Sequence, residues 1–288
     1  LPIVEVEINQ SKVSLNSVNG TLTDIIGKKY FFKFHAEEGE TKTVSEYYQG
    51  QILAGAGLPL IQPLYQKTTP GEQFLIYENI TAPTAFDLCE QFERAYETDG
   101  SYPTEKNNYL AAEQRLLKLQ LDIYLNTLRS APTGEVIDSP LLQLFLWRLI
   151  SRQGAVPRVD LYYTNQSAIL PDRVMSFNEL AQKRWIINGV EYNESIAEII
   201  AKAKEYLNPE REIMLPVVIG HGDEHNGNKF YLNGELVLFD PAFAGVQPAL
   251  LSFVKATVHN TFLHPFWLYD PERLNGKLKF NYRIEDNM

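Results

Sequence analysis

The feature that most constrains this 288-residue chain is the dipeptide Asn233-Gly234, which lies between two mostly apolar segments. Asn-Gly between apolar runs is the strongest short-range signal for a two-residue β-hairpin turn. With these residues as the turn, Asn228 lies opposite Phe239, and Asp240 follows one step beyond. Residues directly opposite in a hairpin have Cβ atoms about 5 Å apart. The hairpin therefore brings an amide and a carboxylate together at its open end, beside the loop that carries Asp223.

The composition is that of an ordinary globular protein, with 44% hydrophobic and 22% charged residues. A chain of this length can bury a substantial core in one large or two smaller domains. It contains no apolar run of about 18 residues, so we expect no transmembrane helix. No basic-then-apolar signal segment precedes the first expected strand, and the lone Cys89 excludes an internal disulfide framework. We therefore expect a cytoplasmic protein.

The net charge of −10 argues against a nucleic acid or an anionic membrane as a partner, because both favour a basic surface. Six acidic residues and two basic ones lie between Asp87 and Lys106. This patch could attract a cationic small molecule, although a solvated helix face is the simpler explanation.

The first 80 residues have mostly the alternating pattern of strands. Asn19-Gly20 predicts a hairpin turn among them. One helix is expected at residues 44–52, where the apolar spacing changes, and Gly55 and Gly57 are expected to end it. The strands are expected at residues 4–8, 13–18, 21–26, 30–34, 60–65 and 73–77.

From about residue 81 the pattern becomes helical. A long helix is expected at residues 110–128, with a core-facing stripe of Leu116, Leu117, Leu121, Tyr124, Leu125 and Leu128. Further helices are expected at residues 141–150, 196–207 and 250–263, and a short hairpin at residues 186–192. These patterns predict an α+β fold, with a β-rich domain at residues 1–80 joined to a mainly helical domain at residues 81–288.

The segment His221-Gly222-Asp223-x-His225-x-x-Asn228, followed by Asp240, resembles the signature of the aminoglycoside phosphotransferase and choline kinase-like family. The Asp-x-x-x-x-Asn spacing is that of a kinase catalytic loop, and Asp240 takes the place of the aspartate in Asp-Phe-Gly. The resemblance implies a two-lobed protein-kinase-like fold. Its small antiparallel β lobe carries one helix and binds nucleotide, and its larger, mainly helical lobe carries the catalytic and substrate residues.

Phosphoryl transfer needs a base for the acceptor hydroxyl, Mg²⁺ between the phosphates and a cation on the phosphates. Asp223 is the candidate base, and Asn228 and Asp240 are the candidate Mg²⁺ ligands. An Asp in a loop is more often a turn or cap residue, but three matching spacings favour the catalytic interpretation. His221 and His225 are expected to brace the loop by hydrogen bonds rather than to touch substrate.

The resemblance implies that the phosphate-binding cation lies on the third strand of the small lobe and pairs with a glutamate on the following helix. Lys33 and Glu46 fit these two positions. A lysine that simply faces solvent is the alternative interpretation of Lys33.

The phosphate-covering loop is expected at Asn19 and Gly20, although one glycine replaces the usual series and a plain hairpin turn would also explain the pair. Backbone contacts to the nucleotide base should come from the segment that joins the two lobes. Because backbone contacts leave no side-chain signature, ATP is the expected donor and GTP stays an alternative. The joining segment comprises Glu78, Asn79 and Ile80.

The acceptor site is weakly encoded. Aromatic side chains near the end of the chain could line a pocket for an apolar or cationic group, but such a stripe is more often part of a core. These residues are Phe253, Phe262, Phe266, Trp267 and Tyr269. The alternation at residues 278–284 predicts a strand, where the family resemblance leads us to expect helix.

The leading hypothesis is an ATP- and Mg²⁺-dependent phosphotransferase that acts on a hydroxyl of a small molecule. The sequence does not decide whether the acceptor is an aminoglycoside, a choline-like alcohol, an amino alcohol or a sugar. It does not decide the oligomeric state either. A second hypothesis is a catalytically silent nucleotide-binding module. A third is a metal-dependent hydrolase that uses His221, Asp223, His225 and Asp240.

Overall fold

The computed structural model describes residues 2–9, 18–35, 45–67, 69, 72–151, 156–208, 210–261 and 281–284. The chain divides into two compact units. Unit 1 comprises Leu1–Thr127, Ile219–Gly245 and Leu250–Met288, and unit 2 comprises Leu128–Val218 and Val246–Ala249.

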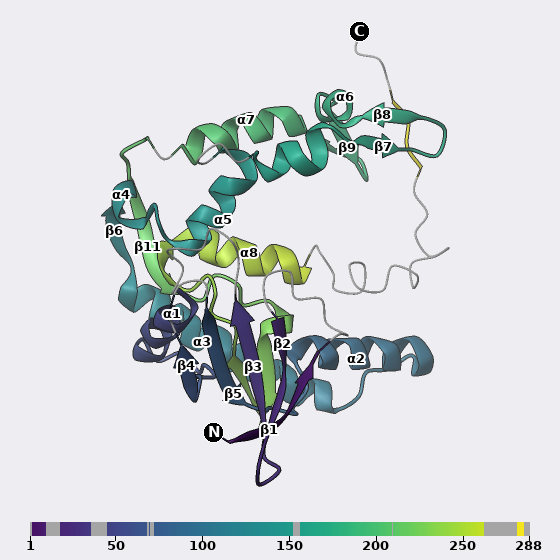
Figure 1. Ribbon diagram of the computed structural model, residues 1–288. Helices are drawn as coiled ribbons and strands as arrows, with labels where there is room; N and C mark the ends of the chain where they lie inside the picture. The colour runs from purple at the N-terminus through teal and green to yellow at the C-terminus, as the bar shows by residue number, and fades with distance from the viewer. Residues whose placement is uncertain are drawn as a thin grey trace. The chain divides into compact units, whose positions relative to one another are not determined.

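Unit 1 begins with a five-stranded antiparallel sheet in the order β1-β2-β3-β5-β4 (Figure 1). Its register places Lys33 of β3 between Asn19 of β2 and Leu75 of β5. Leu22, Tyr30, Phe32 and Ile76 form a small apolar core on this sheet. The strands are β1 (Ile3–Ile8), β2 (Val18–Asp24), β3 (Lys29–His35), β4 (Tyr65–Lys67) and β5 (Gln73–Glu78).

The hairpin turn predicted at Asn19-Gly20 is wrong, because both residues lie inside β2. Gly20 is paired with Phe32 of β3 on one side and with Ile8 of β1 on the other. A Cβ atom on Gly20 would lie 2.0 Å from the carbonyl oxygen of Glu7. The glycine is therefore required by the close approach of the β1 backbone and not by a turn. Most of the strand expected at residues 13–18 lies outside the described residues.

The helix expected after the third strand is α1 (Ser45–Gly55). It ends as predicted at its glycines, since Gly57 has a φ of +95° and the Leu58 amide donates to the Leu53 carbonyl at 3.1 Å. The strand expected at residues 60–65 is displaced to β4. Pro59 precedes that segment and Pro63 lies within it, and neither has an amide hydrogen to donate to a ladder.

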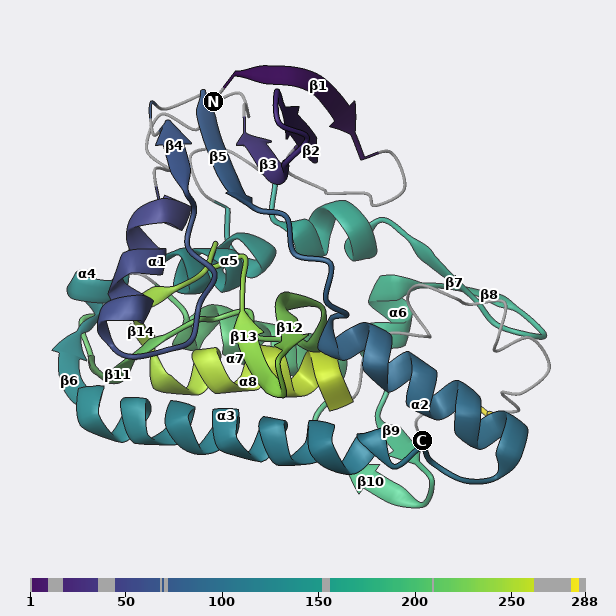
Figure 2. The same cartoon turned by 90° about the horizontal axis from the view of Figure 1, so that it is seen from below.

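Three longer helices complete unit 1: α2 (Ala85–Asp99), α3 (Glu105–Thr127) and α8 (Ala249–Thr261). A capping box formed by Thr84 and Asp87 begins α2. Figure 2 shows α8 running alongside α3, and a hydrogen bond of 2.6 Å joins the Tyr124 and Ser252 hydroxyls of these helices.

The long helix at residues 110–128 is confirmed by α3, but the predicted core-facing stripe is mostly wrong. Only Leu116 of the expected leucines is buried, whereas Leu117, Leu121 and Leu125 are 51%, 56% and 62% exposed. Leucines occupy two faces of the helix, so periodicity alone does not identify the buried one. The buried face comprises Tyr109, Ala112, Leu116, Gln120 and Ile123.

Unit 2 is built from short elements. Strand β11 pairs antiparallel with β6, and α7 begins with a capping box formed by Ser195 and Glu198. The hairpin expected at residues 186–192 is confirmed, with Asn188 and Gly189 at positive φ. The elements are β6 (Arg129–Pro132), α4 (Thr133–Val136), α5 (Pro140–Leu149), a π-helical turn (Asp160–Thr164), β7 (Ser167–Ile169), β8 (Val174–Ser176), α6 (Phe177–Ala181), β9 (Trp185–Ile187), β10 (Val190–Tyr192), α7 (Ile196–Tyr206), β11 (Met214–Gly220) and β14 (Gly245–Pro248).

The predicted fold class is confirmed: the chain is α+β, with an antiparallel β-rich beginning that contains one helix and a mainly helical remainder. The domain boundary expected near residue 80 stays a prediction. Among the described residues, no helix has the length and apolar character needed to cross a membrane.

The end of the chain is described only in part. Helix α8 confirms the helix expected at residues 250–263, and its Phe253 is 58% exposed. Residues 281–284 are not in a strand, and the rest of the strand expected at 278–284 lies outside the described residues. The same holds for the other aromatic candidates for the acceptor pocket, Phe262, Phe266, Trp267 and Tyr269.

Candidate active site

The hairpin around Asn233-Gly234 has the predicted register. It joins β12 (Lys229–Leu232) to β13 (Glu235–Leu238), and Leu232 faces Glu235 across the turn. Asn233 and Gly234 have φ values of +52° and +84°, as a type I′ turn requires. The Phe239 amide donates to the Asn228 carbonyl at 3.1 Å, so these two residues lie opposite each other as expected.

Asp223 lies in the loop between β11 and this hairpin, and its side chain is only 16% exposed. One of its carboxylate oxygens, Oδ1, is in contact with the ammonium group of Lys255 from α8. The same oxygen lies 3.7 Å from Nε2 of His225. A carboxylate that is held in place and remains partly accessible has the properties of a general base.

His221 is fully buried at the start of the loop. Its Nδ1 accepts the Asp223 amide hydrogen at 3.3 Å, so Nε2 carries the ring hydrogen and donates to the Phe239 carbonyl at 2.9 Å. Burial lowers the pKa of His221, which keeps the ring neutral. The ring connects the loop to the residue before Asp240, as a bracing role requires.

His225 makes local contacts of the same kind. Its Nδ1 accepts the Gly227 amide hydrogen at 3.1 Å, and its ring stacks on that of His259, with 4.4 Å between the centroids. Burial lowers the pKa of His225 to about 4, and the nearby Asp223 carboxylate opposes this shift only in part. The imidazole is therefore neutral at neutral pH, and it faces Asp223 without adding a positive charge.

Asn228 is buried and follows Asp223 at the spacing of a kinase catalytic loop. Its Nδ2 donates to the backbone carbonyl of Asp223 at 2.9 Å. The amide group is thereby oriented with Oδ1 as the atom that remains to coordinate a cation.

Asp240 and Lys33 form an ion pair, with 2.7 Å between Oδ1 of Asp240 and Nζ of Lys33. The two residues are 207 positions apart in the sequence. The Lys33 side chain is 13% exposed and that of Asp240 is 37% exposed. Lys33 therefore does not simply face solvent, because it points from β3 to the carboxylate that follows the hairpin.

The backbone at Asp240 is strained, since this non-glycine residue has a φ of +56°. The segment after it packs closely on α1. A Cβ atom on Gly50 of α1 would lie 3.5 Å from Pro241, and one on Gly245 would lie 2.4 Å from Oε1 of Gln49. The distance at Gly50 is that of an ordinary van der Waals contact, so only Gly245 has to be small for α1 and the Asp240 segment to approach each other.

The structure gives the positions of the other residues predicted for the nucleotide site, but it does not test their roles. Glu46 is the second residue of α1, and its side chain lies outside the described part of the structure. Asn19 is the cross-strand neighbour of Lys33, so it lies beside that residue within the sheet. Glu78 ends β5 and is exposed, whereas Asn79 and Ile80, which follow it, are half-buried. Gly20 is buried in β2.

Two charged residues were not predicted from the sequence, one on α8 beside the loop and one within the loop itself. Lys255 approaches Asp223 from α8, and its ammonium also lies 4.4 Å from the ring centroid of Phe243. Glu224 is buried against α3, where it accepts a hydrogen bond from Nε2 of Gln120 and another, of 3.4 Å, from the Tyr124 hydroxyl. Burial raises the pKa of Glu224 to about 7.

The oxygen atoms around Asp240 suit a magnesium ion. Asn228 Oδ1 and the Asp240 carboxylate are hard oxygen donors from the two strands of one hairpin, both at its open end. Within the described ranges, no group of three or more His, Cys, Asp or Glu side chains is arranged to hold a metal. Magnesium that takes two protein ligands together with phosphate oxygens and water needs no such group.

No protein-family model matches this chain, and no curated protein matches it. Solved structures are similar to it. An amicoumacin kinase in complex with AMP-PNP, Ca²⁺ and Ami is 14% identical over 90% of this chain and 65% of that chain, with a TM-score of 0.41. This chain therefore spans less than two thirds of the length of that kinase.

Two aminoglycoside phosphotransferases are similar at the same level. An aminoglycoside-3′-phosphotransferase of type VIII is 13% identical over 89% of this chain and 79% of that chain, with a TM-score of 0.46. An aminoglycoside phosphotransferase from Streptomyces rimosus is 10% identical over 96% of this chain and 87% of that chain, with a TM-score of 0.43.

Proposed function

We propose that this chain is an ATP- and Mg²⁺-dependent phosphotransferase that transfers the γ-phosphoryl group to a hydroxyl of a small molecule. The observation that carries the proposal is the ion pair of 2.7 Å between Lys33 and Asp240. It joins a sheet lysine to the carboxylate beside the loop of Asp223 and Asn228. Phosphoryl transfer requires a phosphate-binding cation, metal ligands and a base in one place.

Each residue has a role that follows from its contacts. Lys33 binds phosphate oxygens, and its contact with Asp240 sets the position of its ammonium group. Asp223 accepts the proton of the acceptor hydroxyl, and Lys255 and His221 hold the carboxylate and its backbone in place. Asn228 and Asp240 would hold the magnesium ion, which neutralises charge between the phosphates when bound.

The hydrolase alternative is disfavoured by the geometry of His221. Both nitrogens of this ring are engaged by backbone groups, Asp223 N–H on one side and Phe239 C=O on the other. A metal would have to displace one of these buried hydrogen bonds. A hydrolase would also have no use for the contact between Lys33 and Asp240.

The proposal is tested by measuring ATP consumption against a panel of aminoglycosides, choline-like alcohols, amino alcohols and sugars. Asp223→Asn keeps the size of the side chain and removes its basicity, so turnover should fall by about 10²-fold or more while ATP binding is retained. Asp172→Asn is the matched control, because Asp172 is an exposed aspartate of unit 2. It should leave both quantities unchanged.

Two outcomes would contradict the proposal. If Asp223→Asn turned over an accepted substrate at the rate of the unchanged protein, Asp223 would not be the base. If calorimetry showed ATP binding but no acceptor of the panel stimulated ATP consumption, a silent nucleotide-binding module would replace the phosphotransferase. GTP in place of ATP in the same assays identifies the preferred donor.

A further inference from the structure

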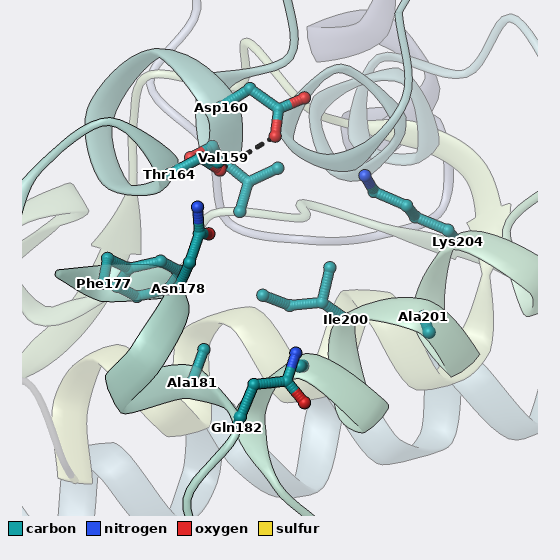
Figure 3. A pocket seen from close by; sticks show the side chains of 11 residues that line it. Val159, Asp160, Thr164, Phe177, Asn178, Ala181, Gln182, Ile200, Ala201 and Lys204 are labelled. Carbon is teal, nitrogen blue, oxygen red and sulfur yellow. Dashed lines mark hydrogen bonds between the residues drawn. The ribbon is translucent and has the colours of Figure 1, made fainter.

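Unit 2 contains a hollow of about 290 Å³ that shares no residue with the site around Asp223 (Figure 3). The π-helical turn Asp160–Thr164, α6 and α7 provide its walls. Its volume is at the lower end of the range for small-molecule sites. A π-helical turn is rare and occurs frequently at functional sites.

One wall of the hollow is apolar. Phe177 is held in place by the ring of Tyr163, with 5.6 Å between the centroids, and Ala181 is buried. Small side chains leave room beside them for a short aliphatic group. The apolar lining comprises Val159, Phe177, Ala181, Ala197, Ile200 and Ala201.

The polar lining carries one charge of each sign. The Thr164 hydroxyl donates to Oδ1 of Asp160 at 2.9 Å, which orients this carboxylate and leaves its second oxygen for another donor. Lys204 of α7 is half-buried, and among the described residues no acceptor contacts its ammonium group. Figure 3 shows Lys204 extending toward the side of the hollow on which Asp160 lies.

We propose that this pocket binds a small zwitterion, an aliphatic α-amino acid or a similar amino-carboxylic acid. Its ammonium group would bind Asp160, its carboxylate would bind Lys204, and its side chain would lie on the apolar wall. A ligand with only a carboxylate would leave Asp160 without a partner and place a second negative charge near it. A ligand with only an ammonium group would do the same to Lys204, with a second positive charge. Asn178 and Gln182, which also line the hollow, supply amide groups for further hydrogen bonds.

This inference rests on unit 2 alone and is independent of the proposed phosphotransfer. The probe is therefore a ligand without a hydroxyl group, and the readout is binding rather than ATP consumption. A failure of either proposal leaves the other intact.

The test is a calorimetric titration of the full chain with three ligands that share the leucine side chain and differ in which charged groups they carry. L-Leucine carries both charges, N-acetyl-L-leucine lacks the ammonium group and L-leucine amide lacks the carboxylate. Leucine should bind saturably, and each of the other two should bind at least about tenfold more weakly, because one charge-assisted contact is lost. No saturable binding of leucine, or equal binding of all three ligands, would overturn the proposal.

Two variants locate the site. Lys204→Met should weaken the binding of leucine about tenfold and leave that of leucine amide unchanged. Asp160→Asn should weaken the binding of leucine and of leucine amide, and it should leave the binding of N-acetyl-leucine unchanged. Lys202→Met, on the same helix and outside the pocket, is the control and should change none of them. If leucine binds and neither pocket variant alters it, the site lies elsewhere and the assignment is wrong.

Discussion

The ammonium group of Lys255 on α8 contacts the carboxylate of Asp223, the candidate base in the loop before β12. Both side chains are 16% exposed. The contact fixes the oxygen that would take the proton of the acceptor.

Lys255→Met is therefore expected to lower turnover by about tenfold or more, because the Asp223 carboxylate loses the group that orients it. Nucleotide affinity should change little, since Lys33 is the residue proposed to bind the phosphates. Lys255→Arg keeps the positive charge and should restore part of the rate, which a purely structural role of the alkyl chain would not predict. Steady-state kinetics with varied ATP separates the two effects. Lys118→Met, at an exposed position of α3, is the control.

Lys33→Met is expected to weaken ATP binding about tenfold or more, because the charge-assisted contact to phosphate is lost. Lys29 lies on the same strand and is exposed, so Lys29→Met should bind ATP normally. Calorimetric titration with ATP in the presence of Mg²⁺ measures both. Equal affinities of the two variants would remove Lys33 from the nucleotide site.

The buried carboxyl of Glu224 should make stability depend on pH. Burial raises its pKa to about 7 in the folded chain from 4.5, so its contribution is fully present below about 4.5 and is lost as pH rises through about 7. Glu224→Gln resembles the protonated acid. The variant should be more stable than the unchanged protein at pH 9, by about 3 kcal/mol, and similar to it at pH 4.

Thermal or denaturant unfolding between pH 4 and pH 9 tests this expectation. Glu205→Gln, at an exposed position of α7, should follow the unchanged protein across the whole range. If Glu224→Gln kept the full pH dependence of the unchanged protein, Glu224 would not be the group responsible.

Gly20→Ala is expected to destabilise the chain by about 2 kcal/mol or more, because the new Cβ would overlap the Glu7 carbonyl oxygen on β1. Gly55→Ala is the same substitution at the end of α1, where nothing lies within 4 Å of the new atom. It should have little effect. Denaturant unfolding of the two variants gives the difference, and a Gly20→Ala chain of unchanged stability would mean that β1 can move away.

The sequence predicted those parts of the site that depend on short-range rules. The hairpin from Lys229 to Leu238 has its expected register because a two-residue turn fixes which residues face each other. The position of Lys33 on a strand was also predicted, since the run of aromatic residues around it is typical of a strand. The roles of both remain proposals about chemistry.

The errors arose where a residue pattern fits two structures. Asn-Gly favours a tight turn, but Asn19-Gly20 lies within β2, and the approach of β1 explains the glycine. The leucines of α3 occupy two faces, and the buried one contains the polar Gln120 because Glu224 lies opposite it. Neither fact is present in a short window of sequence.

The sequence by itself determined the fold class, the hairpin and the spacing of Asp223, Asn228 and Asp240, because these follow from local backbone geometry. Only the tertiary structure decided which distant side chains meet there. It paired Asp240 with Lys33 and Asp223 with Lys255, and it buried Glu224. Such contacts depend on how helices and strands far apart in the chain pack, and packing is a property of the whole fold.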